Sequence, residues 1–138
     1  MSAPIMQALY NTVNAAAQTT STASVVSLTG GKIFLGIGPI DFNPPMVVYQ
    51  VITDPIMPAF TKDSHETHVQ FDVYCDAAAG ATAAQAIQDA LITQLHRTTA
   101  TATGYGFVQF NCMDFGGPVT DEDRILRIQS DWRIIARK

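Results

Sequence analysis

One stretch of this chain, His65 to Asp76, constrains its fold more than any other, because apolar and polar residues alternate along it from His68 onward. Successive side chains of a β-strand point to opposite faces, so this pattern predicts a strand with one dry face and one wet face. The dry set is Val69, Phe71, Val73 and Cys75, and the wet set is His68, Gln70, Asp72 and Tyr74. A dry face must be buried against another element, so the chain needs a second layer.

The other predicted strands differ in how many faces they should bury. The segment Arg124–Arg137 alternates in the same way and is predicted to be a half-buried strand, as is Phe107–Asp114. Met46–Thr53 is nearly all apolar, which predicts a central strand covered on both faces. A further short strand is expected at Lys32–Ile37.

Two segments have a single apolar stripe at the helical period, and we expect helices at Pro4–Gln18 and Thr82–His96. The Thr/Ser-rich stretch Thr19–Ser27 should end the first helix, because hydroxyl side chains compete for backbone hydrogen bonds. The order α-β-β-β-α-β-β, in one domain covering residues 1–138, predicts an α+β two-layer sandwich with two helices packed on a mainly antiparallel sheet. The dry face of the clearest strand should pack against Ile87, Leu91 and Trp132.

Composition narrows the class of function. The chain is 47% hydrophobic and only 14% charged, which suggests that partners cover part of its surface. Its net charge is −4 and its longest basic run is Arg137-Lys138, so the charge pattern of a nucleic-acid binder is missing. No apolar run reaches the ~20 residues of a membrane span, and no signal peptide is visible. We expect a protein made in the cytosol, with Cys75 and Cys112 as free thiols.

Several short patterns resemble catalytic motifs without their context. His65-Glu66-Thr67-His68 has the wrong His spacing for a zinc helix and lies in a predicted strand. Gly30-Gly31-Lys32 lacks the Ser/Thr of a phosphate loop, so a glycine turn is the better interpretation. Asp114-Phe115-Gly116 matches a kinase triplet in letters only, because no other kinase motif accompanies it.

Ser, His and Asp residues are present, but no nucleophile elbow is. His96 closes the second predicted helix, where a cation stabilises the C-terminal end of the helix dipole. The sequence therefore predicts no catalytic, cofactor-binding or metal-binding residues, and a protein that is not an enzyme.

Apolar residues outside the regular elements are the candidate interface. Ile56, Met57 and Phe60 lie in a proline-containing loop over Asp54–Ser64, and Tyr105 follows a Thr/Ala-rich connection. Such residues either fold back onto their own core or contact a partner. Pro55 and Pro58 favour a partner, because they reduce the entropy lost when a loop docks.

An ordered series of segments resembles the tail-completion (tail-terminator) proteins of bacteriophages, small head-tail joining proteins catalogued mostly as a domain of unknown function. The resemblance rests on a helix with Ala8-Leu9-Tyr10, the turn and strand Gly30-Gly31-Lys32-Ile33-Phe34, the strand Pro44-Pro45-Met46-Val47-Val48-Tyr49-Gln50-Val51, the strand His65–Tyr74, the helix with Ala86-Ile87 and Ala90-Leu91, and the final strand Arg127–Arg133. It spans nearly the whole chain, although Thr98–Thr103 and Phe115–Pro118 are less typical.

The resemblance implies a structural virion protein that forms a homohexameric ring in the neck. The ring would cap the tail-tube protein and join it to a head-tail connector or stopper protein, and DNA would pass through the lumen without specific binding. The family offers no catalytic residues. Two alternatives stay open, namely another phage neck or tail component (a head-completion stopper or a tail-tube subunit) and a small cytosolic enzyme or ligand-binding domain.

Charge adds one expectation about such a ring. Each phosphate neutralised by Lys or Arg adds binding that DNA must break as it moves. We therefore expect an acidic or neutral polar lumen, with Arg127 and Arg133 near carboxylates such as Asp131 on the wet face of the sheet.

Overall fold

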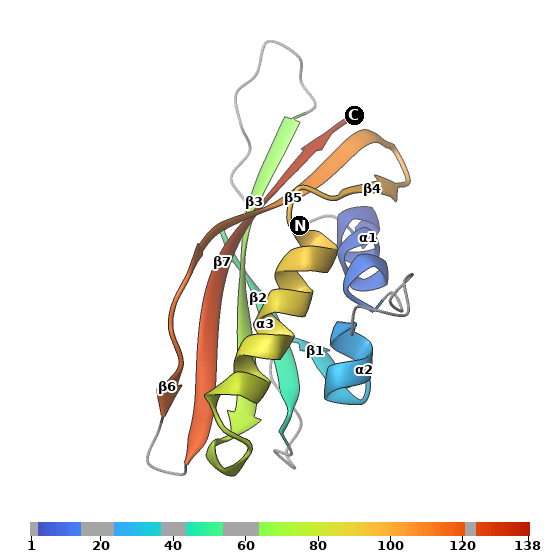
Figure 1. Cartoon of the computed structure of the whole chain (residues 1–138). Coiled ribbons are helices and arrows are strands. Elements are labelled where there is room, and N and C mark those ends of the chain that lie inside the picture. The colour runs from blue at the N-terminus through green and yellow to red at the C-terminus, as the bar shows by residue number, and fades with distance from the viewer. Residues whose placement is uncertain (1–2, 15–23, 37–43, 54–63, 121–123) are drawn as a thin grey trace.

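The computed structural model describes residues 3–14, 24–36, 44–53, 64–120 and 124–138. Its strands form a single sheet in the order β1-β2-β3-β7-β5-β4, with the short β6 paired to β7 beyond the end of β5 (Figure 1). Only β1 and β2 run parallel, and all other neighbours are antiparallel. The strands are β1 Ile33–Leu35, β2 Met46–Thr53, β3 Ser64–Asp76, β4 Thr99–Ala102, β5 Tyr105–Phe115, β6 Val119–Thr120 and β7 Ile125–Arg137.

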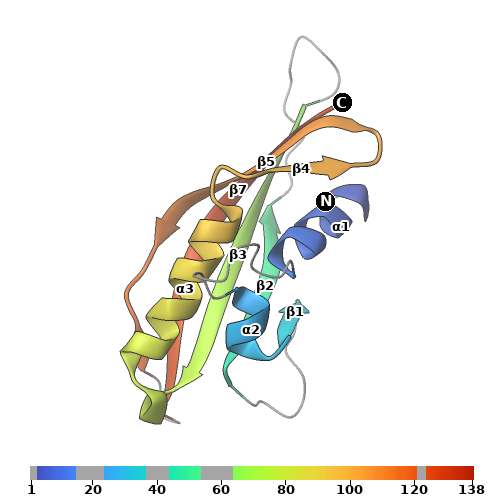
Figure 2. The same ribbon diagram turned by 45° about the vertical axis from the view of Figure 1, so that its right-hand side comes forward.

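The described helices lie on one side of this sheet, and α3 crosses it along β3 and β7 (Figures 1 and 2). Gly80, with a φ of 83°, leads into α3. This conformation favours glycine, which explains why the helix begins there. The helices are α1 Ala3–Val13, α2 Val25–Thr29 and α3 Ala81–Leu95, with a short 3-10 turn at Ala77–Ala79.

The predicted two-layer sandwich with two helices on a mainly antiparallel sheet is wrong. The sheet is mixed and strongly curled, so that it approaches half of a barrel, and about half of the described residues are in strands. Long strands accumulate right-handed twist, and register shifts in β2 and β5 bend the sheet further. Among the described residues, three short helices therefore lie against a curved mixed sheet, where two helices on a mainly antiparallel sheet were expected.

The added helix, α2, lies in the hydroxyl-rich stretch that was expected only to end a helix. Ser24 and Ser27 form a capping box, in which each side chain accepts a hydrogen bond from the backbone N–H of the other residue. Hydroxyl groups that disfavour a helix interior are among the best groups at its start. The glycine turn after α2 is confirmed, because Gly30 and Gly31 have φ values of 63° and 81° and lead into β1.

The predicted core of the clearest strand is confirmed. Every member of its dry set, together with Ile87, Leu91 and Trp132, is buried in one cluster. The Phe71 ring stacks on Tyr49 at a centroid distance of 5.2 Å and meets Trp132 edge-on at 5.9 Å. These ring contacts join β2, β3 and β7 on the covered face of the sheet.

Candidate functional site

The helices cover one face of the sheet and leave the other open, and the open face is the candidate functional site. Strand β7 shows both faces clearly because its side chains alternate between them. The covered side of β7 carries Leu126, Ile128, Ser130, Trp132, Ile134 and Ala136, all buried, and the open side carries Arg127, Gln129, Asp131, Arg133, Ile135 and Arg137, all exposed or half-buried.

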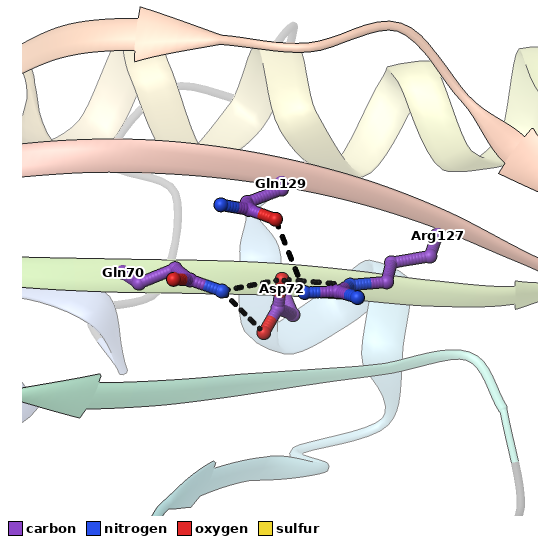
Figure 3. A network of polar contacts seen from close by, with 4 residues as sticks. All are labelled: Gln70, Asp72, Arg127 and Gln129. Atoms are coloured by element: carbon purple, nitrogen blue, oxygen red, sulfur yellow. Dashed lines mark hydrogen bonds and ion pairs between the residues drawn. The ribbon is translucent and has the colours of Figure 1, made fainter.

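A polar network occupies the middle of the open face (Figure 3). Asp72 on β3 is only 5% exposed, and its Oδ1 accepts a hydrogen bond from Arg127 Nε at 3.0 Å. Gln70 donates from Nε2 to both Asp72 oxygens at 3.3 and 3.2 Å, and Arg127 also donates to Gln129 Oε1 at 3.1 Å. The Asp72 carboxylate is thus held by charge-assisted hydrogen bonds across two strands, the kind that are stronger than neutral ones.

A second, looser group lies farther along the same two strands. Glu66 Oε1 is 3.2 Å from His68 Nε2 and 3.5 Å from Arg133 Nε. Arg133 Nε has no aligned hydrogen bond, so the second contact is an ion pair only. The expectation that Arg127 and Arg133 lie near carboxylates on the wet face is therefore confirmed, although their partners are Asp72 and Glu66 and not Asp131.

At one end of the open face there is a hollow of about 360 Å³, where β5 leaves β7. A register shift after Cys112 places Asp114 directly opposite Asp131, and Gly116 then hydrogen-bonds Gln129 O at 2.8 Å. Two carboxylates directly opposite each other across a strand pair repel. The hollow is lined by Asp114, Phe115, Gly116, Gly117, Val119, Arg127, Gln129 and Asp131.

Apolar side chains lie exposed around this hollow. Phe115 and Val119, which line it, and Met113, which precedes Asp114 on β5, each leave more than half of their surface open to solvent. Such a group of exposed apolar residues beside polar ones is typical of an interaction surface.

The opposite end of β7 is aromatic and basic. Arg137 lies 5.9 Å from the centroid of the Phe107 ring, and Lys138 Nζ lies 5.9 Å from the centroid of the Tyr105 ring. Both contacts are cation–π pairs at the end where the chain terminates (Figure 1). Tyr105, a candidate interface residue in the sequence, is half-buried at the start of β5.

The other three candidate interface residues, Ile56, Met57 and Phe60, lie outside the described residues, so their role stays a prediction. The hollow was missed because Asp114 and Asp131 meet only through the pairing of β5 with β7. The single available signal was the exposed triplet Phe115-Gly116-Gly117 after an alternating strand, which marks where a strand leaves the sheet.

The catalytic resemblances find no support in the geometry. His96 lies at the C-terminal end of α3, where its Nδ1 accepts a hydrogen bond from the Cys112 backbone N–H at 2.9 Å. Asp114 lies at the end of β5, beside the hollow. In the parts of the chain that the structure describes, no three His, Cys, Asp or Glu side chains are grouped to hold a metal ion. No helix among these residues has the length and apolar character needed to cross a membrane.

Both cysteines are free thiols, as expected. Burial raises the pKa of Cys75. Burial also raises the pKa of Cys112, and the charges of Asp114 and Asp131 raise it further against the opposing effect of a backbone hydrogen bond. A raised pKa keeps a thiol protonated and unreactive, so neither cysteine has the character of a nucleophile.

Comparisons with known proteins place this fold. A chain from a structure described as the virion of a native gene transfer agent particle is similar at a TM-score of 0.72 and 17% identity, over 98% of this chain and 96% of that one. A second solved chain is similar at a TM-score of 0.62 and 14% identity, over 99% and 92%. No curated protein matches the sequence. The family described as tail completion protein gp17 matches residues 16–136. The chain therefore belongs to the tail completion protein gp17 family of bacteriophages.

Proposed function

We propose that the protein is a structural component of the tail of a bacteriophage or phage-like particle, and hence part of the virion. The observation that carries this proposal is the family match over residues 16–136, which leaves little of the chain outside it. The similarity to a chain of a gene transfer agent virion over 98% of this chain supports it at the level of fold.

We further propose that the protein is the tail terminator. About six copies, the number that the family resemblance implies, would form a ring that caps the tail tube and joins it to the head connector. The net charge of −4 per copy suits a ring through which DNA moves. Arg127 and Arg133 already face carboxylates, so they have less capacity to hold phosphate groups.

The test is to produce particles from a genome that lacks this gene and to image them by negative-stain electron microscopy. A terminator is needed to stop tube growth, so we expect tubes of excessive and irregular length and heads without tails. Supplying the protein from a plasmid should restore tails of uniform length. Tails of normal length attached to heads would contradict the proposal.

The same images separate the alternatives. Loss of a head-completion stopper would leave tails of normal length beside leaking heads, and loss of a tail-tube subunit would leave no tubes. The charge argument has its own readout. The purified protein should not retain duplex DNA at low salt, and tight, salt-sensitive binding would contradict a neutral or acidic lumen.

A further inference from the structure

The apolar-rimmed hollow at the end of the open face is lined by two carboxylates and by one cation, Arg127, whose charge is already paired with Asp72. Asp114 and Asp131 face each other across β5 and β7, and within the described residues no Lys or Arg forms an ion pair with either carboxylate. The exposed side chains of Phe115 and Val119 lie beside them. A segment that fits this surface must therefore be both apolar and cationic. A long side chain can place its stem on apolar rings and its charge on carboxylates.

The chain itself carries such a surface at the other end of β7. The aromatic, basic tip consists of Tyr105, Phe107, Arg137 and Lys138, in which two cations lie over two rings. It therefore presents the positive charge that the hollow lacks, backed by apolar rings.

One copy cannot join its own tip to its own hollow. Asp131 and Arg137 lie six residues apart on the same regular strand, which at ~3.3 Å per residue keeps them about 20 Å apart. Figure 1 shows the C-terminal end of β7 and the β6 end at opposite extremes of the sheet. A contact between the two surfaces must therefore join different copies.

We propose that the tip of one copy docks into the hollow of the next, with Arg137 and Lys138 beside Asp114 and Asp131. Two different surfaces meet in this contact, so the copy that gives its tip keeps its hollow free, and the copy that gives its hollow keeps its tip free, for further neighbours. Contacts of this kind build a ring when the rotation closes. The inference deepens the proposed terminator function by naming the contact between subunits, but it is tested by self-association alone, without tails.

Two charge-reversed proteins test the contact. One carries Asp114→Arg and Asp131→Arg, and the other carries Arg137→Glu and Lys138→Glu. In each protein alone, tip and hollow have the same charge, so self-association measured by light scattering over a concentration series should weaken by at least about tenfold. In an equal mixture the reversed tip of one protein meets the reversed hollow of the other, and the native tip meets the native hollow. Both contacts then join opposite charges, so association should return to near the wild-type level.

Single reversals elsewhere provide matched controls. Arg97→Glu and Asp89→Arg change the same charges on exposed residues outside both surfaces and should leave association unchanged. Denaturant unfolding should show that every variant is folded. Milder changes, Asp131→Asn and Arg137→Gln, should weaken association in the same direction but less.

Three results would overturn the proposal. They are a wild-type protein that stays monomeric at all concentrations, reversed proteins that associate as the wild type does, and a mixture that fails to recover. If only the hollow variant loses association, the hollow receives a different part of the neighbour. Normal tails formed with the tip variant would reject this contact while leaving the terminator function standing.

Discussion

The two faces of strands β3 and β7 differ although they are made from alternate residues of the same segments. The covered face contains apolar side chains in ring-to-ring contact, and Trp132 Nε1 donates to the buried Ser130 Oγ there at 2.9 Å. The open face contains ion pairs and amides and ends in an apolar-rimmed hollow. Tight packing fixes which side chains the covered face can hold. The open face combines ion pairs between neighbouring strands with exposed side chains that partners can contact.

This difference separates stability from function. The fold depends on the covered face, where loss of a ring leaves a cavity that the neighbours cannot fill. The open face can vary at most positions without unfolding the protein, since exposed substitutions usually change stability by only about 0.5 kcal/mol. Changes on one face should therefore lower the free energy of unfolding, and changes on the other should affect assembly.

The largest expected effect is that of Phe71→Ala on the covered face. Phe71 is completely buried between Tyr49 and Trp132, so the substitution should lower the free energy of unfolding by about 3–5 kcal/mol in a denaturant titration. The matched control is Gln50→Ala, an exposed residue on the neighbouring strand, which should change it by less than about 0.5 kcal/mol. Equal effects would remove the distinction between the two faces.

The second prediction concerns the one place where the open face should also contribute stability. Arg127→Ala removes the cation from the nearly buried Asp72, and the free energy of unfolding should fall by about 1.5–3 kcal/mol. Arg137→Ala removes an exposed cation over Phe107 and should cost about 1 kcal/mol or less. If the two substitutions lower the free energy of unfolding equally, the contact between Arg127 and Asp72 contributes no more than an exposed ion pair.

The period of apolar residues in the sequence predicted the helices and strands that bury one apolar face. Alternation located β3 and β7, and the helical stripe located α3, at Ala81–Leu95 against an expected Thr82–His96. The pairing of Thr99–Ala102 as β4 was missed because a Thr/Ala-rich segment has little hydrophobic period of its own. The curl of the sheet was also missed, because it arises from twist and register shifts distributed over several strands.

The candidate site was less predictable than the fold, because it depends on how distant strands pair. The partners of Arg127 and Arg133 were expected to be carboxylates on the wet face, since the alternation of β7 places both arginines there. Which carboxylates these are depends on the register between β3 and β7, and a shift of one residue would have changed every pair. The facing of Asp114 and Asp131 depends further on the irregular register at the end of β5, which no spacing in the sequence indicates.

A third prediction tests an exception on the covered side. Gln88 in α3 is fully buried, and neither side-chain amide atom has a hydrogen-bond partner among the described residues. Because an unpaired buried polar group is costly, Gln88→Met should raise the free energy of unfolding by about 1 kcal/mol. Gln85→Met, which removes a surface hydrogen bond to Asp89, should have little effect. Destabilisation by Gln88→Met would mean that the amide has a partner, such as a buried water.

The smallest expected effect concerns how the stability of the covered side depends on pH. Two ionisable groups of the covered side have raised pKa values, Cys75 through burial and Tyr49 through burial first and the nearby Tyr10 second. In the unfolded chain the thiol loses its proton around its ordinary value of 9.0, whereas the folded thiol keeps it to higher pH. The folded state then binds more protons than the unfolded state, so stability is fully present below pH 9 and decreases as pH rises above it. Cys75→Ala should lower stability at neutral pH but flatten its alkaline decrease, measured by denaturant titrations between pH 7.5 and 10. Parallel pH profiles for the two proteins would show that Cys75 contributes nothing to the decrease.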